Sequence, residues 1–232
     1  MSPARLEPMT PDLVFLLDVD NTLLENDSVT RDLKRHLETK LGHDACIRYF
    51  DIFGALRQEL GYADYLGALQ RYRLEHPHQR ALLEVSDFLI DYPFAERLYP
   101  GSLEVLRHLK TLGRTVILSD GDVVFQPHKI RRAGLEQAVG GNVLIYIHKE
   151  LELSEVEHLY PATHYVVIDD KLRLLSRIKM QWRGRVTTIF VRQGHYAVDP
   201  DETEPYPEAD LTVEGIGDLL ELPLQAFGAG KF

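Results

Sequence analysis

The feature that most constrains the fold is an apolar run that stops abruptly at two acids. Leu13 to Leu17 is long enough for one buried strand, and Asp18 and Asp20 follow it directly. Asn21 and Thr22 then favour a turn. Two carboxylates at the carboxyl end of a buried strand lie where open α/β sheets bind their ligands. Taken alone, the motif is equally compatible with an ordinary solvated turn, so the rest of the chain must decide.

Five further strands are expected after residue 98, most of them separated by a helix. The expected strands lie at 115–118, 142–147, 165–168, 186–191 and 211–213. The expected helices lie at 102–112, 125–133, 154–160, 172–182 and 214–222, with a surface loop at 194–210. Alternating strands and helices imply right-handed crossovers and a mostly parallel sheet that is covered on both faces. The expected fold class is therefore α/β, with a Rossmann-like core.

A long helical stretch interrupts this pattern between the first two strands. Apolar residues recur at helical spacing in the segments 30–42, 44–60, 62–75 and 80–90. No strand pattern occurs among them, so a separate, inserted all-helical subdomain is expected. The expected division gives residues 1–23 and 99–232 to the core and residues 24–98 to the helical subdomain.

Chemically useful side chains end each of the first four expected strands. Besides the two acids of the first strand, they are Ser119, Asp120, Lys149, Asp169 and Asp170. The carboxyl ends of parallel strands meet at one edge of the sheet, so these groups are expected to converge on one crevice. Several carboxylates in one crevice repel one another. A hard divalent cation such as Mg²⁺, which prefers oxygen ligands, would offset that repulsion.

This ordered set resembles the four motifs of the haloacid dehalogenase-like (HAD) superfamily. The first motif corresponds to Asp18-Val19-Asp20-Asn21-Thr22, and the other three correspond to Ser119, Lys149 and Asp169-Asp170. The resemblance spans residues 13 to about 192, and the helical stretch falls where the family carries a C1-type cap. Asn21 stands where the family more often has glycine, and Glu150 follows Lys149 where proline is frequent. Neither difference removes a catalytic group.

The resemblance implies a reaction through an aspartyl-phosphate intermediate. Asp18 would be the nucleophile, and Asp20 would protonate the leaving oxygen and later deprotonate the attacking water. Asp18, Asp20 (through its backbone carbonyl) and Asp169 would bind Mg²⁺. Asp170 would not contact the metal directly but would act through these ligands or through a water molecule.

The resemblance also implies that Ser119 and Lys149 bind the phosphoryl oxygens, the lysine as a point charge. Lys129 is the competing candidate for this lysine. It lies in an expected helix ten residues after Ser119, whereas Lys149 ends a strand, so Lys149 is preferred. The sequence has neither a GxSxG elbow nor a GxxxxGK loop, which argues against a Ser-His-Asp hydrolase and a P-loop kinase.

Asp20 decides the reaction class that the resemblance implies. Family members that cleave carbon–halogen bonds lack an acid at this position, because a halide leaves without a proton. The expected function is therefore a Mg²⁺-dependent phosphatase, a phosphoric monoester hydrolase that acts on a small phosphorylated metabolite. Two alternatives stay open: a sugar phosphomutase, and a non-catalytic ligand-binding protein with the same fold.

In the family, the cap closes over the active site and selects the substrate. The expected hinges are residues 24–29 and 96–101. The candidate substrate contacts are arginines and tyrosines of the expected cap, namely Arg48, Tyr49, Arg57, Tyr62, Tyr65, Arg71, Tyr72 and Arg73. Most side chains of this kind on helices lie at the surface, so none is preferred over the others.

The charge distribution and the cysteine count limit the kinds of partner and cofactor that the chain is expected to bind. The net charge is −10, and nine acids but no Lys or Arg lie between Gln193 and Gly230, so the rest of the chain is nearly neutral. Because no basic stripe is present, nucleic acid is not an expected partner. Cys46 is the only cysteine, which excludes an intrachain disulfide and a cysteine metal cluster.

The sequence shows no feature of a membrane protein. No apolar run approaches the roughly 20 residues that span a bilayer. Residues Met1 to Pro11 lack the basic start and apolar middle of a signal peptide. A soluble cytoplasmic protein without a membrane partner is expected. Neither the oligomeric state nor the role of the acidic segment 193–230 follows from the sequence.

Overall fold

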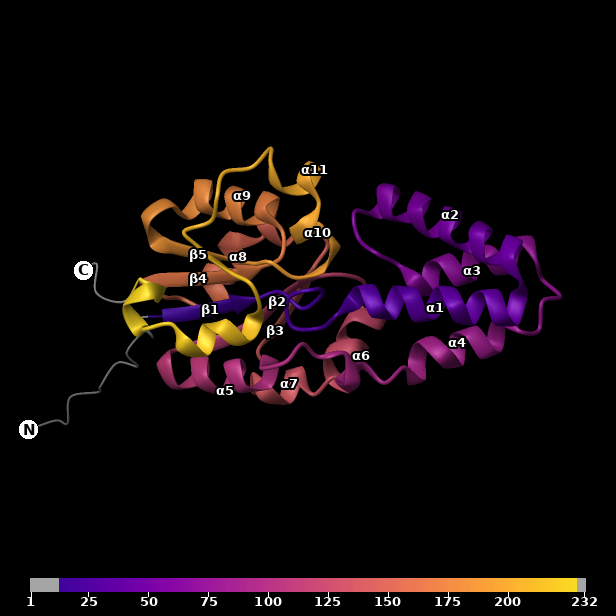
Figure 1. Ribbon diagram of the computed structural model, residues 1–232, viewed down its shortest axis with the longest axis horizontal. Coiled ribbons are helices and arrows are strands. Elements are labelled where there is room, and N and C mark those ends of the chain that lie inside the picture. The colour runs from indigo at the N-terminus through magenta and orange to yellow at the C-terminus, as the bar shows by residue number, and fades with distance from the viewer. Residues whose placement is uncertain (1–12, 229–232) are drawn as a thin grey trace, which may run out of the picture.

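The computed structural model describes residues 13–228 and consists of an α/β core and a helical cap (Figure 1). The core contains one six-stranded sheet in the order β3-β2-β1-β4-β5-β6, and every neighbouring pair is parallel. The strands are β1 (Leu13–Leu17), β2 (Arg114–Asp120), β3 (Val143–Tyr146), β4 (His164–Asp169), β5 (Val186–Val191) and β6 (Leu211–Val213). The predicted α/β class with a parallel sheet is confirmed.

Alternation along the central strand divides the core into two apolar layers. Val14 and Leu16 of β1 pack with the helices on one face of the sheet, and Phe15 and Leu17 pack with those on the other. The first face carries α8 (Leu153–Leu159) and α9 (Leu172–Trp182). The second face carries α5 (Ser102–Leu112), α6 (Phe125–Arg132) and α7 (Leu135–Ala138), as Figure 1 shows. Burial on both faces explains why β1 is apolar at every position.

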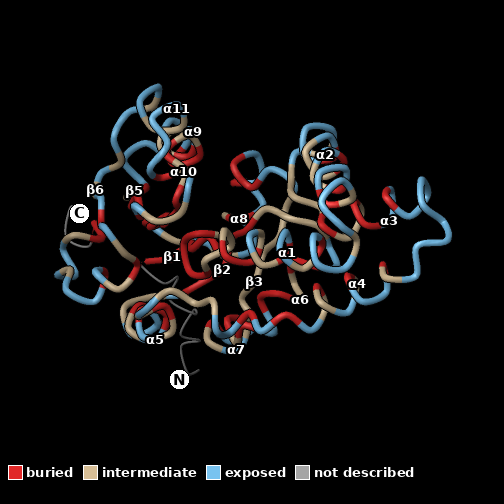
Figure 2. The backbone as a smooth tube through the Cα atoms, turned by 45° about the vertical axis from the view of Figure 1, so that its right-hand side comes forward, coloured by how far each residue is buried: buried red, intermediate tan, exposed pale blue. Residues whose placement is uncertain are grey.

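The cap consists of four α-helices and a short 3₁₀ helix. They are α1 (Asn26–Leu41), α2 (His43–Leu60), α3 (Tyr65–Glu75), α4 (Leu82–Asp91) and η1 (Phe94–Arg97). The inner sides of these helices are buried and their outer sides are exposed (Figure 2). The apolar interior of the cap is continuous with the layer under α5 and α6, since Phe94 of η1 packs on Phe125 of α6. The predicted helical insertion is therefore confirmed as a cap that rests on the core.

The two chain segments that join the cap to the core lie side by side. Leu24 and Leu98 form an antiparallel bridge. The amide of Glu25 donates to the carbonyl of Arg97 at 2.8 Å, and the amide of Tyr99 donates to that of Leu23 at 3.0 Å. Both crossings thus form one hydrogen-bonded neck, residues 23–25 and 97–99.

Three local expectations need correction. Helix α1 begins at Asn26 and not near Thr30, because Asn21 Oδ1 accepts the amide of Asp27 at 3.2 Å. The hydroxyl of Thr30 instead donates to the carbonyl of Asn26 inside the helix. The expected loop at 194–210 contains the short helices α10 (Gly194–Val198) and α11 (Pro200–Thr203). The expected helix at 214–222 is a 3₁₀ helix, η4 (Ile216–Glu221).

Three further 3₁₀ helices complete the description of the chain. They are η2 (Lys149–Leu151), η3 (Arg183–Arg185) and η5 (Leu224–Phe227). Within residues 13–228, no helix is long and apolar enough to cross a bilayer. The N-terminal segment that was examined for a signal peptide lies outside the described residues.

Asp32 connects α1 to Tyr92, at the end of α4, and to Arg97 of the neck. Its Oδ2 accepts the Tyr92 hydroxyl at 2.6 Å and the Arg97 guanidinium at 2.9 Å. The hydrogen bond from Tyr92 is the main cause that lowers the pKa of Asp32; burial opposes it, and Arg97 adds to it. A lowered folded-state pKa stabilises the fold above the unfolded pKa and loses this contribution as the pH falls through the folded pKa.

We therefore expect Asp32→Asn to lower the free energy of unfolding by about 1 kcal/mol at pH 7, and by less near pH 3. Urea unfolding at the two pH values measures the difference. Glu104→Gln is the matched control, because Glu104 pairs with Arg107 on the exposed surface of α5 and is expected to change little. An equal loss at both pH values would contradict the role of the Asp32 charge.

Candidate active site

Strand register brings two of the predicted acids together. β1 pairs with β4 so that Leu17 lies opposite Ile168, and the amide of Asp18 donates to the carbonyl of Ile168 at 3.0 Å. Asp18 therefore lies next to Asp169 as both strands reach the carboxyl edge of the sheet. Both side chains are almost completely buried. A parallel pairing in this register is sufficient to place the two carboxylates side by side.

Lys149 lies between these carboxylates. Its Nζ is 2.5 Å from Asp18 Oδ1 and 2.7 Å from Asp169 Oδ2, and it donates to the carbonyl of Leu118 at 3.2 Å. Burial alone would lower the pKa of Lys149, but Asp169, Asp18 and Asp120 outweigh it and hold that pKa well above its usual value. Lys149 is thus a buried cation shared by two acids. Lys149, and not Lys129, contacts Asp18, and its role in binding the phosphoryl oxygens stays a prediction.

The same lysine determines the state of Asp18. Burial raises the pKa of Asp18, but the ammonium groups of Lys149 and Lys171 more than compensate, so this pKa lies below its usual value. Lys149 engages Oδ1, whereas the buried Oδ2 of Asp18 has no hydrogen-bond donor among the described residues. The two lysines therefore favour the charged form of Asp18, and Oδ2 is left for another ligand or for chemistry.

Asp170 completes a group of oxygens that suits a metal ion. One carboxylate oxygen each from Asp18, Asp169 and Asp170 lies within 4.8 Å of the others. Both oxygens of Asp170 are buried without a hydrogen-bond partner in the described part of the chain, and burial raises the pKa of Asp170 well above its usual value. Buried acids of this kind are costly unless a cation neutralises them. The donor set therefore fits a hard divalent cation such as Mg²⁺.

Lys171 is a member of the site that the sequence motifs did not indicate. It follows Asp170 directly, and its Nζ lies 3.9 Å from Asp170 Oδ1. Burial lowers the pKa of Lys171, but Asp170, Asp18 and Asp169 outweigh it and raise this pKa above its usual value. A cation immediately after two acids at a strand end was the sequence signal that could have identified it.

Asp120 fixes the loop that carries Lys149. Its Oδ1 accepts the backbone amide of Lys149 at 2.8 Å, and burial raises its pKa. Because its carboxylate accepts this backbone hydrogen bond, Asp120 has a structural role in the site. The loop after β3 is thereby held against the end of β2, which places Lys149 over Asp18.

Asp20 points away from the metal-ligand group. Lys129 Nζ lies 2.6 and 2.8 Å from its two carboxylate oxygens and also donates to Asn26 Oδ1 at 3.1 Å. Lys129 is therefore the partner of Asp20 and of the first cap helix. Its sequence position ten residues after Ser119 gave no indication of this contact.

Ser119 lies on the Asp20 side of the site. Its buried hydroxyl accepts Nε2 of Gln126 at 2.9 Å, and the same nitrogen lies 3.5 Å from Asp20 Oδ2. Gln126 was not singled out in the sequence. The predicted site residues thus form two neighbouring groups: one holds Asp18, Lys149, Asp169 and Asp170, and the other holds Asp20 and Ser119.

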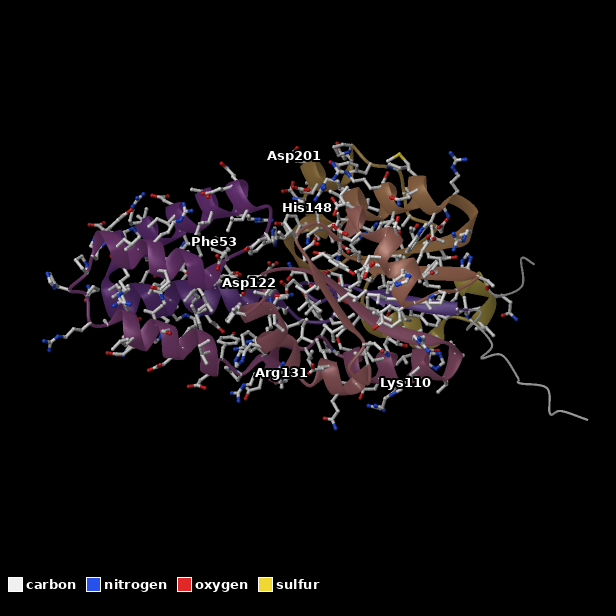
Figure 3. The ribbon with its side chains drawn as sticks, turned by 180° about the vertical axis from the view of Figure 1, so that it is seen from behind. Phe53, Lys110, Asp122, Arg131, His148 and Asp201 are labelled. Carbon is white, nitrogen blue, oxygen red and sulfur yellow. The ribbon has the colours of Figure 1, made fainter. Side chains whose placement is uncertain are left out.

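Most of the cap candidates are committed to the cap itself. Arg48 and Arg71 pair with glutamates on the cap surface, and the Tyr49 hydroxyl donates to a buried carbonyl of the cap at 2.8 Å. Tyr65 instead faces the core, where its ring lies 5.5 Å from that of Phe125. The loops that end β2 and β3, marked by Asp122 and His148, lie at the boundary between cap and core (Figure 3).

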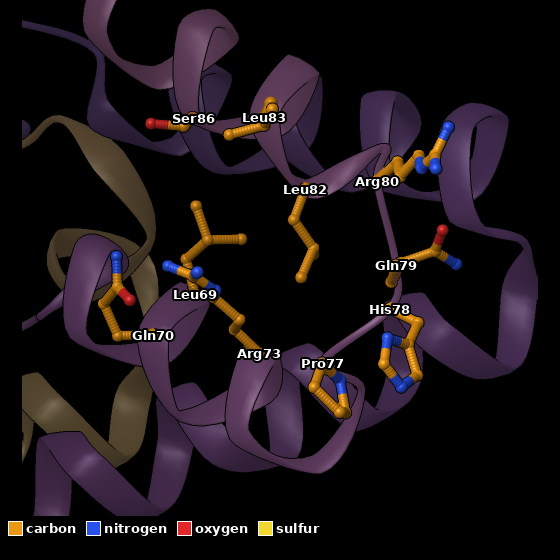
Figure 4. Close-up of a pocket in the computed structure, with 10 residues that line it drawn as sticks. All are labelled: Leu69, Gln70, Arg73, Pro77, His78, Gln79, Arg80, Leu82, Leu83 and Ser86. Carbon is orange, nitrogen blue, oxygen red and sulfur yellow. The ribbon is translucent and has the colours of Figure 1, made fainter.

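A separate hollow of about 510 Å³ lies between α3, α4 and their connection. Figure 4 shows that Arg73, Arg80 and Leu82 are among the residues that line it. None of its lining residues belongs to the acid and lysine groups at the sheet edge. The chemistry therefore belongs to the sheet edge and not to this hollow.

Comparison with known proteins agrees with the geometry. Residues 13–173 match the family of haloacid dehalogenase-like hydrolases. The chain is similar to a haloacid dehalogenase-like hydrolase from Burkholderia xenovorans LB400, with 60% identity, 93% of this chain and 98% of that chain covered, and a TM-score of 0.88. No protein of curated function matches the sequence.

More distant structures share the fold. One is L-2-haloacid dehalogenase from Xanthobacter autotrophicus with covalently bound chloropropionic acid, at 16% identity, with 90% of this chain and 97% of that chain covered and a TM-score of 0.62. Another is the HAD-hydrolase YfnB from Bacillus subtilis bound to magnesium, at 15% identity, with 90% and 96% covered and a TM-score of 0.59. At this level of identity they support the architecture alone.

Mg²⁺ is expected to raise the midpoint of thermal unfolding. A ligand bound only by the folded state stabilises it by about 2.7 kcal/mol at 100 times its dissociation constant. We expect Asp170→Asn to lose most of this shift, because it removes one charge of the group, whereas Asp44→Asn on the exposed start of α2 keeps it. Thermal unfolding with and without Mg²⁺ measures both. Equal shifts in the two variants would place the ion elsewhere.

Proposed function

This chain belongs to the family of haloacid dehalogenase-like hydrolases, and from that premise we propose that it is a Mg²⁺-dependent phosphatase. Its substrate would be a small phosphorylated metabolite, and the reaction would pass through an aspartyl-phosphate on Asp18. The observation that carries the proposal is the Asp18 carboxylate, which is held ionised by Lys149 beside two further acids. Such a group suits attack on a phosphoryl centre but needs cations to offset the repulsion between anions.

Lys149 performs two tasks in this scheme. It orients Asp18 through Oδ1, and its charge offsets the approach of an anionic phosphoryl group. The Ser119 hydroxyl, bound by Gln126 in the same crevice, would donate to a phosphoryl oxygen. Both groups are buried and held by neighbouring contacts, so they are organised before substrate arrives.

Asp18, Asp169 and Asp170 would hold the metal, and the backbone carbonyl of Asp20 would be a further ligand. A bound Mg²⁺ would supply charge neutralisation for the nucleophile and the phosphate. The unpartnered oxygens of Asp18 and Asp170 support this assignment, as does the magnesium bound to the related YfnB. The short distances between oxygens of Asp18, Asp169 and Asp170 support a direct contact of Asp170 with the ion, in place of the indirect role that the sequence suggested.

Asp20 would move the protons. It would protonate the leaving oxygen of the ester and then deprotonate the water that hydrolyses the intermediate. Asp20 follows Asp18 by two residues, and its side chain is held by Lys129 and Gln126. The presence of this acid supports ester hydrolysis over carbon–halogen cleavage, because a halide needs no proton to leave.

We expect Asp18→Asn to reduce the turnover of p-nitrophenyl phosphate by at least about 1,000-fold in the presence of Mg²⁺, because the amide cannot attack phosphorus. Asp44→Asn is expected to retain wild-type turnover. Phosphate release measures both. Activity that survives Asp18→Asn would exclude the aspartyl-phosphate route.

Asp20→Asn is expected to depend on the leaving group. An alkyl phosphate needs a proton on its leaving oxygen, so we expect a loss of about 100-fold or more, and a smaller loss with p-nitrophenyl phosphate, whose leaving group is stable as an anion. The ratio of kcat values for the two esters measures the effect. The same ratio in variant and wild type would contradict proton donation by Asp20. Isomerised sugar phosphate without free phosphate would indicate a phosphomutase instead.

A further inference from the structure

Arg57, in the last turn of α2, extends from the cap toward the core. Its guanidinium carbon lies 5.4 Å from the centroid of the Tyr196 ring, which belongs to α10 of the core. Lys171 Nζ lies 5.0 Å from the centroid of the same ring. Tyr196 therefore brings a cap cation and an active-site cation to one aromatic group, across the boundary between the two parts of the protein.

Arg57 contrasts with Arg48 and Arg71 of the cap, each of which has an acid partner. Arg48 and Arg71 form ion pairs with Glu75 and Glu59, at 2.5 and 3.0 Å. Within residues 13–228, Arg57 forms no ion pair, and its side chain is exposed. An exposed guanidinium that rests on an aromatic ring keeps its five donors available for a ligand.

The position of Arg57 is fixed from both sides of the active site. On one side, Tyr196 connects it to Lys171, which lies 3.9 Å from Asp170. On the other, Arg57 is close enough to Tyr65 to oppose the rise that burial causes in the pKa of that tyrosine.

Tyr65 in turn connects to the acid that would move protons. Its hydroxyl accepts Asn26 Nδ2 at 3.2 Å, and Asn26 Oδ1 binds Lys129, the partner of Asp20. Arg57 is thus linked to both groups of the site, through Tyr196 to Lys171 and through Tyr65 to Asn26.

The end of α2 rests directly on the core, which limits how far Arg57 can move in this arrangement. Gly61 follows α2 with φ +85°, and a Cβ there would lie 2.4 Å from Cε1 of His148. Glycine adopts this φ without strain and lets the end of α2 contact the His148 side chain on the loop that carries Lys149. The guanidinium is therefore presented by a supported helix end and not by a free loop.

We propose that Arg57 binds a second anionic group, a carboxylate or a second phosphate, on the leaving group of the substrate. This rests on the proposed phosphatase function, because it assumes that the phosphoryl group is bound at Asp18. A guanidinium matches the planar geometry of carboxylate and phosphate oxygens and can bind them with two parallel hydrogen bonds. The substrate class is then a small phosphate monoester with a second negative charge, and Arg57 determines specificity.

Binding measurements in a variant that is expected to be inactive test the role of Arg57 separately from catalysis. In an Asp18→Asn background with Mg²⁺, isothermal titration calorimetry compares 3-phosphoglycerate with glycerol 3-phosphate, and 1,3-propanediol bisphosphate with 3-hydroxypropyl phosphate. Each pair differs in one anionic group, a carboxylate in the first and a phosphate in the second. We expect at least one pair to show about tenfold or greater preference for the anionic member, and the responding pair identifies the group.

Adding Arg57→Met is expected to abolish that preference, Arg57→Lys to keep part of it, and Arg71→Met to leave it unchanged. Thermal unfolding verifies that each variant is folded; a change is not expected, because Arg57 is exposed. Equal binding within both pairs, a preference that survives Arg57→Met, or no binding of any ester would overturn the proposal. Absent phosphate release from the wild type would instead contradict the phosphatase function and leave these binding results valid.

Discussion

The contact of Lys149 with Asp18 and Asp169 is the interaction on which the rest of the site depends. Two carboxylates cannot both stay ionised in a buried position unless a cation is close to them, because desolvation and mutual repulsion both favour protonation. Lys149 provides one positive charge at 2.5 and 2.7 Å. Lys171 provides a second, while Asp170 and Asp120 add two more acids. The surplus of acids over lysines at this edge is the physical reason why a divalent cation fits there.

The geometry of the fold makes this contact possible. The three chain segments that supply Asp18, Lys149 and Asp169 are far apart in sequence, and parallel pairing of β1 with β4 and of β3 with β1 through β2 aligns their carboxyl ends. Asp120 then holds the loop of Lys149 by its backbone amide. A shift of one residue in the pairing of β1 and β4 would turn the Asp18 side chain toward the opposite face. The pairing register of β1 with β4 therefore fixes the geometry of the site as well as the packing of the core.

The strands of the sheet and the acids at their ends could be predicted from sequence, because each of them is marked by a local pattern of residues. The apolar run before Asp18 predicts a buried strand, and the alternation of strands and helices predicts the parallel sheet. The start of α1 could not be predicted, because Asn21 binds Asp27 across a turn that no local pattern indicates. The partnership of Lys129 with Asp20 joins residues 109 positions apart, and helical periodicity gives no information on which residue a buried lysine meets.

The same long-range contacts connect the cap to the chemistry. Lys129 binds Asp20 and Asn26 together, and Asn26 is the first residue of α1, directly beside the hydrogen-bonded neck. Any displacement of α1 must therefore change the contacts of the lysine that orients Asp20. Arg57 lies at the same boundary between cap and core, against α10 of the acidic C-terminal segment. The core supplies Asp18 and its lysines, whereas the cap supplies Asn26 and Arg57 at its boundary with the core. The proposed substrate contact of Arg57 and the proposed proton transfer by Asp20 therefore both depend on how the cap is placed on the core.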